Sequence, residues 1–120
     1  MCQDLGIENK LIPRIATAFA GGMARQGEVC GAVVGALMCI GIKHGREAPE
    51  QVDDEAMRLA AELVRSFKEK TGSLYCRELT GHDLTTQEGV EAYRASDAPM
   101  RVCIPAVGFA YEKTLELLPA

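Results

Sequence analysis

The sequence predicts an all-α domain, a compact bundle of about five helices around a buried central helix rich in glycine and alanine. Apolar residues recur at steps of three and four in several stretches, the spacing that lines one face of a helix. Alternation of apolar and polar residues, which is typical of strands, never extends beyond about four residues. The length of 120 residues is that of one ordinary domain. We therefore expect residues 1–120 to form a single helical domain.

The first predicted helix extends from Ile7 to Phe19, and a pair of glycines ends it. Its apolar residues follow the spacing of one helix face: Leu11, Ile12, Ile15, Ala16 and Phe19. Gly21 and Gly22 follow, and the stretch from Gly22 to Gly27 has the backbone freedom of a loop. The sequence thus predicts a helix followed by a glycine-containing loop.

The central helix is predicted from Glu28 to Lys43. Every residue between these two is apolar or small, which indicates a helix buried on most sides. Glu28 would lie at the positive end of the helix dipole, and Lys43 and His44 at the negative end, where their charges are favourable. Gly31 and Gly35 are four residues apart and would allow another helix to approach closely.

The clearest helix begins at Asp53, after a linker at Arg46–Val52, and Gly72 follows it as a stop. Acidic residues occupy its first turn, where the helix dipole favours negative charge. The residues that follow helical spacing on the predicted apolar face are Met57, Ala60, Ala61, Val64 and Phe67. The opposite face is charged, so we expect this helix to pack amphipathically against the central helix.

The C-terminal part of the chain predicts a short helical turn at Cys76–Leu79, a helix at Gln87–Ala95 and a final helix at Val102–Leu118. Pro99 breaks the chain before the final helix. Pro105 has no backbone N–H and is tolerated only in the first helical turn. Cys103 is therefore predicted at the beginning of a helix.

Composition and charge argue against several classes of function. The formal net charge of −4 differs from the clustered basic charge of nucleic-acid binders, so we expect no nucleic-acid partner. The longest apolar run, Val29 to Ile42, is shorter than the roughly twenty residues that a membrane-spanning helix needs, so we expect no membrane insertion. Residues 1–10 show no secretory signal, which predicts a cytoplasmic protein.

The most informative residues are the cysteines. The chain has five, an odd number that does not suit a disulfide framework, and cytoplasmic thiols stay mostly reduced. Cys30 and Cys103 are predicted at helix beginnings, where the dipole favours a negative sulfur, and Cys76 is followed by Arg77. Cys30, Cys76 and Cys103 are our candidates both for redox chemistry and for metal ligation.

Other interpretations of the cysteines are open at this point. The chain has no C-x-x-C pair, and buried cysteines can serve only as small apolar residues. Cys39 follows Cys30 by nine residues, which places it on the opposite side of the same helix, outside any shared site. Cys2 lies near an end that should fray. The predicted cofactor-binding residues beside the sulfurs are Arg25, whose charge would assist a thiolate, and Gly31, which follows Cys30.

Two blocks of sequence resemble a known family. The first runs from Phe19 to Arg25 and from Gly27 to Met38, and it contains C-G-A-x-x-G at Cys30–Gly35. The second comprises Phe67–Lys70 and Gly72–Gly81, and Cys103 matches the last cysteine. The blocks resemble the C_GCAxxG_C_C family of small proteins assigned a redox role, over roughly residues 15–117. The family is related to the iron–sulfur domain of split-Soret cytochromes.

The resemblance implies a helical redox domain with four cysteines, three of which match Cys30, Cys76 and Cys103. The family's first cysteine precedes an additional helix that we do not find after Met1, and Cys2 is not a clear match for it. Cys2, a second subunit in a homodimer or an exogenous ligand could complete the site.

Three functions follow as hypotheses. In the first, the three cysteines bind an iron–sulfur cluster or another thiophilic metal and pass electrons to an unidentified redox partner protein. In the second, they cycle between thiols and a disulfide. In the third, the chain is a non-catalytic helical interaction domain with structural cysteines. No hydrolytic motif supports an enzyme of another class.

Overall fold

The computed structural model describes residues 1–119, and within this range the chain forms helices, turns and one isolated β-bridge. The α-helices are α1 (Leu11–Ala16), α2 (Gly31–His44), α3 (Asp54–Thr71), α4 (Cys76–Thr80), α5 (Gln87–Ala95) and α6 (Ile104–Leu117). Short 3-10 turns lie at Gln3–Leu5 and Thr17–Phe19, and a π-helical segment at Pro99–Cys103 leads into α6. The predicted all-α fold is confirmed.

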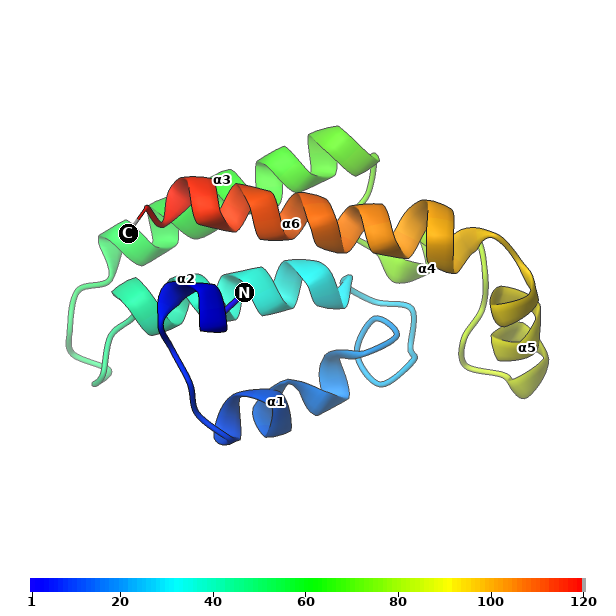
Figure 1. The fold of residues 1–120 in the computed structure, drawn as a ribbon, viewed down its shortest axis with the longest axis horizontal. Helices are drawn as coiled ribbons and strands as arrows, with labels where there is room; N and C mark the ends of the chain where they lie inside the picture. The colour runs from blue at the N-terminus through cyan, green and yellow to red at the C-terminus, as the bar shows by residue number, and fades with distance from the viewer. Residues whose placement is uncertain (120) are drawn as a thin grey trace.

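Helices α2, α3 and α6 pack together and form the core (Figure 1). Small side chains are buried on both α2 and α6, among them Ala36, Ala106 and Ala110. Larger side chains fill the space on α3, where Leu63 and Phe67 have no exposed surface. The glycine- and alanine-rich helix is therefore central, as predicted. The predicted close approach of another helix at Gly31 and Gly35 is wrong, because a Cβ at Gly35 would meet no atom within 4 Å and one at Gly31 would meet the Phe19 carbonyl.

The buried face of α3 is shifted by comparison with the predicted one. Met57, which was predicted to face inward, is 63% exposed. The buried residues of α3 are Ala56, Leu59, Leu63 and Phe67. These residues also follow steps of three and four, but they line a neighbouring side of the helix. Such a choice is open because α3 has more apolar residues than one buried face needs. Gly72 ends the helix in a left-handed conformation, as expected for a C-terminal glycine.

The predicted first helix is too long at both ends. α1 begins at Leu11, whose N–H donates to Asn9 Oδ1, and it gives way to the 3-10 turn after Ala16. Pro13 explains the late start, because proline fits only in the first turn of a helix. If the helix began at Ile7, Pro13 would lie in the middle of the helix, where proline is not tolerated.

No helix among residues 1–119 is long and apolar enough to cross a membrane.

Candidate functional site

The three cysteines singled out in the sequence line one cavity of about 310 Å³. They come from three separate parts of the chain: Cys30 directly precedes α2, Cys76 begins α4, and Cys103 ends the π-helical segment. The predicted residues Arg25 and Gly31 also line this cavity. The remaining lining residues are Gly21, Gly22, Ala32, Leu84, Val90, Tyr93, Arg94 and Val107. We call this space the cysteine cavity.

A short antiparallel pairing places Cys30 and Cys76. Val29 and Tyr75 form an isolated antiparallel bridge, flanked by two backbone hydrogen bonds. The Cys30 N–H donates to the Leu74 carbonyl and the Cys76 N–H to the Glu28 carbonyl, each at 2.7 Å. Since side chains alternate between faces, Cys30 and Cys76 lie on the same face as diagonal neighbours, with Cα atoms typically about 7–8 Å apart.

This pairing corrects the predicted beginning of the central helix. Glu28 lies outside α2, which begins at Gly31, and Cys30 is the residue that precedes its first turn. The chain around Glu28 is extended because its carbonyl and that of Gly27 accept the N–H groups of Cys76 and Arg77. Cys30 still lies at the positive end of a long helix dipole, which favours negative charge on its sulfur.

The wall beside Cys76 is a left-handed turn. Gly21 and Gly22 have positive φ angles, and so do Met23, Ala24 and Arg25, at 65°, 52° and 64°. Each L-residue in this conformation costs about 1–2 kcal/mol, so the surroundings must hold the turn in place. Backbone hydrogen bonds do so, among them those from Met23 N–H to the Phe19 carbonyl and from Glu28 N–H to the Gly22 carbonyl. The sequence predicted only a loop here.

Gly22 is in tight contact with Cys76. A Cβ atom at Gly22 would lie 2.6 Å from Cys76 Cβ and 2.7 Å from the Glu28 carbonyl oxygen. Both distances are far below normal contact, so only glycine fits at this position. The tight turn therefore sets the position of one of the three sulfurs.

Cys76 is the most enclosed of the three cysteines, with 9% of its surface exposed. Burial raises the pKa of its thiol, and the nearby sulfurs of Cys103 and Cys30 raise this pKa further. A hydrogen bond involving Thr80 acts in the opposite direction. Arg77, which was expected to favour a thiolate at Cys76, instead forms an ion pair with Glu28. Cys76 is therefore held as a neutral thiol by its surroundings.

Cys103 directly precedes α6, as predicted, but its backbone is not the free start of a helix, because a π-helical segment comes before it. Helical backbone begins at Pro99, and Cys103 is the last residue of the π-helical segment, which continues directly into α6. Pro105 follows at the start of α6 and has no N–H to donate. A wider π turn before the proline avoids the clash that a regular α-helix would produce there. One helical stretch can therefore pass through both prolines.

Tyr93 is a residue of the site that sequence reasoning missed. Its hydroxyl oxygen lies 3.1 Å from Cys103 Sγ. Burial raises the pKa of Tyr93 to about 12, and the hydrogen bond to Cys103 and the neighbouring sulfurs contribute. Tyr93 and Arg94 come from α5, and no local pattern in that helix indicates that it covers the cysteines. The hydrogen bond and the two arginines, Arg25 and Arg94, give the cavity a polar side.

The other two cysteines lie elsewhere. Cys39 is buried in the core, on the side of α2 away from the cysteine cavity, in agreement with the predicted helix geometry. Cys2 was expected in a fraying end, but it packs against the core with its sulfur 3.2 Å from that of Cys39.

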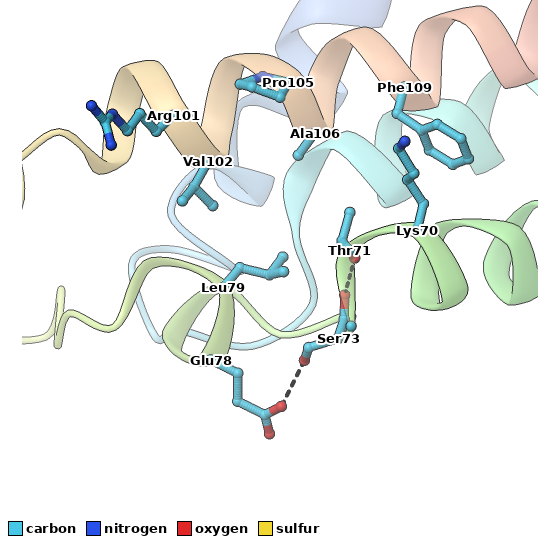
Figure 2. A pocket seen from close by; sticks show the side chains of 11 residues that line it. Lys70, Thr71, Ser73, Glu78, Leu79, Arg101, Val102, Pro105, Ala106 and Phe109 are labelled. Carbon is cyan, nitrogen blue, oxygen red and sulfur yellow. Dashed lines mark hydrogen bonds between the residues drawn. The ribbon is translucent and has the colours of Figure 1, made fainter.

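A larger cavity of about 460 Å³ contains no cysteine (Figure 2). It lies between the end of α3, α4 and the beginning of α6, with Lys70 and Arg101 among its charged residues. Its polar groups bond to one another: Thr71 donates to the Ser73 carbonyl, and the Ser73 hydroxyl donates to Glu78. The three candidate cysteines therefore lie outside this larger cavity.

Among residues 1–119, no group of three or more His, Cys, Asp or Glu side chains has the arrangement that holds a metal ion. The cysteine cavity nevertheless offers the ligands that a thiophilic metal or cluster prefers, because three cysteines from separate elements line one space. All five cysteines are free.

Comparison with known proteins bears on the identity of the chain. No curated protein and no solved structure matches it. A family model described as "Putative redox-active protein (C_GCAxxG_C_C)" matches residues 1–117. This range is nearly the whole chain and contains both sequence blocks and all three cysteines of the cavity. The chain therefore belongs to the C_GCAxxG_C_C family.

Proposed function

We propose that this protein is an electron-transfer protein in which Cys30, Cys76 and Cys103 hold an iron–sulfur cluster or another thiophilic metal group. One observation carries the proposal: the three sulfurs come from distant parts of the chain and line the same cavity. Membership of a redox-active family supports it. When bound, the group would supply reversible one-electron chemistry.

The spacing of the cysteines favours a bridging group over a direct disulfide between Cys30 and Cys76. Diagonal neighbours across an antiparallel pair are typically about 7–8 Å apart at Cα, beyond the 4.4–6.8 Å common for disulfides. Joining these two sulfurs directly would require the backbone to move, whereas an inorganic group can span the gap. The paired backbone that holds both cysteines opposes such movement.

Charged and polar residues of the cavity would tune the bound group. The guanidinium groups of Arg25 and Arg94 offset the negative charge that several thiolates bring together. Tyr93 can donate a hydrogen bond to the sulfur of Cys103, which withdraws electron density from that ligand. Cys76 must lose the proton that its surroundings favour, so binding should release protons and weaken as pH falls.

Anaerobic reconstitution tests the proposal. The purified protein is incubated with ferrous iron and sulfide, desalted, and examined by visible absorption and by iron and sulfide analysis. We expect a brown protein with stoichiometric iron, and loss of most of the iron in the variants C30S, C76S and C103S. C2S is the matched control, since it removes a thiol outside the cavity. Colourless wild-type protein, or cavity variants that retain as much iron as C2S, would contradict the proposal.

A second candidate is thiol–disulfide exchange between Cys76 and Cys103. Both Cys103 and Cys30 raise the pKa of Cys76, and the effect of Cys103 is the larger one. Cys103 is therefore the stronger electrostatic neighbour of Cys76. Mild oxidation followed by tryptic mapping separates the two candidates, since Cys76 and Cys103 lie in different tryptic peptides. A single specific link between these peptides in protein that takes up no iron would favour exchange. Random pairing would exclude it.

A further inference from the structure

A second pair of sulfurs lies outside the cysteine cavity. Cys2 Sγ is 3.2 Å from Cys39 Sγ, within hydrogen-bonding distance for sulfur. Cys2 directly precedes the 3-10 turn Gln3–Leu5, whereas Cys39 lies in the second half of α2. The contact therefore joins positions 37 residues apart in the chain. In Figure 1 the N-terminal turn crosses α2, in agreement with this contact.

The two sulfurs differ in access. Cys39 is 2% exposed and belongs to the core. Its burial, together with the Cys2 sulfur, raises the pKa of Cys39 to about 12. Cys2 is only half-buried and lines a surface cavity of about 340 Å³. A small molecule can thus reach Cys2 directly, and Cys39 only through Cys2.

Charges in this surface cavity indicate what kind of molecule fits. Lys10 and Glu8 line it together with Cys2, so it offers one positive and one negative group beside the sulfur. A ligand with a carboxylate and an ammonium of its own would match both groups. Disulfides derived from amino acids, such as glutathione disulfide, have these charges.

We propose that Cys2 and Cys39 form a redox-active dithiol that a zwitterionic low-molecular-weight disulfide oxidises to an intramolecular disulfide. The Cys2 thiolate attacks one sulfur of the small disulfide, whose S–S bond breaks, and one small thiolate leaves with the electron pair. The sulfur of Cys39 then attacks the Cys2 sulfur, and the second small thiolate leaves with the electron pair and takes up the proton of Cys39. Two protein thiols and one small disulfide become one protein disulfide and two small thiols, so the protein gives up two electrons.

This dithiol is independent of the proposed function, because it uses no residue of the cysteine cavity. The disulfide would attach the N-terminal turn to α2. It would do so at a point where Cys2 and Leu5 already pack against the core, so formation needs little rearrangement.

The test isolates the pair in the variant C30S/C76S/C103S, which is incubated with glutathione disulfide and mapped by mass spectrometry. Trypsin releases Cys2 within residues 1–10 and Cys39 within residues 26–43. Replacing Cys30 is essential, since the second peptide contains both Cys30 and Cys39. We expect one link between these peptides in monomeric protein. It should form in preference to links between chains at micromolar protein, because the two sulfurs already lie 3.2 Å apart. If the triple variant does not fold, C30S alone gives the same unambiguous map.

Two controls make the proposal falsifiable. Adding C39S should leave Cys2 as a stable mixed disulfide with glutathione, which shows that Cys39 is the resolving thiol. K10Q should slow the reaction with glutathione disulfide by roughly two- to fivefold, the range of one surface charge pair, without slowing the reaction with neutral hydroxyethyl disulfide. K43Q is the matched control. Mixed disulfide or chain-to-chain links as the main product in the presence of Cys39 would overturn the dithiol. An unchanged rate in K10Q would overturn the assignment of the ligand class.

Discussion

Replacing Gly22 with alanine tests the contact that positions Cys76. The matched control is Gly72→Ala, because Gly72 also has a left-handed φ, 90° against 70°, but no atom within 4 Å of a Cβ built on it. Both variants force alanine into the left-handed region at about 1–2 kcal/mol. Both recover about 0.4–1 kcal/mol through the lower entropy of the unfolded chain. Gly72→Ala should therefore lose about 1 kcal/mol of unfolding free energy.

Gly22→Ala should lose more. Its methyl group would lie 2.6 Å from Cys76 Cβ and 2.7 Å from the Glu28 carbonyl oxygen, so backbone atoms must move. Overpacking of this kind costs about 1–3 kcal/mol in addition to the left-handed strain. We expect Gly22→Ala to be about 2 kcal/mol less stable than Gly72→Ala in equilibrium urea unfolding of the reduced proteins. Iodoacetamide should also label Cys76 faster in Gly22→Ala alone. Equal stability of the two variants would refute the packing argument.

Three further predictions concern stability. Oxidation of the Cys2–Cys39 pair closes a loop of 37 residues and should stabilise the protein by about 4 kcal/mol on the chain-entropy model, measured by urea unfolding with and without reductant. The pKa of Cys39 is raised from 9.0 to about 12, so the unfolded chain loses this proton first. Stability should therefore fall as pH rises from 9 toward 12, and it should fall less steeply in Cys39→Ala, as unfolding at pH 8 and pH 10.5 would show. Thr86→Ala removes the side chain that accepts the Gly89 N–H at 3.0 Å at the start of α5 and should cost about 1 kcal/mol in thermal unfolding. A loss within 0.3 kcal/mol of zero would mean that this cap contributes nothing.

Local patterns predicted the helices well where burial and propensity agree. α3 has an acidic first turn, a spaced apolar face and a terminal glycine, and it begins and ends within about one residue of the prediction. The Gly/Ala-rich composition of α2 correctly indicated its central place. The shared family was also identifiable, because two blocks and a distant cysteine match in order.

Tertiary contacts explain what the sequence could not show. Glu28 has the charge expected at a helix beginning, yet its backbone pairs with Cys76 from a segment far along the chain. The left-handed turn contains Met23, Ala24 and Arg25, three residue types with no preference for positive φ, so no local signal predicts it. Pro105 lies in the first turn of α6, as predicted, but no local signal indicates the π-helical segment that precedes it.

Helix α2 separates the two groups of sulfurs. Cys30 directly precedes its first turn and Cys39 lies nine residues later, which corresponds to about 13 Å along a helix axis. This length is far beyond the reach of a disulfide, so a thiol at one position cannot attack the sulfur at the other while α2 is intact. The helix would thus keep the two proposed chemistries apart. Each can have its own oxidation state within a single small domain, without scrambling between them.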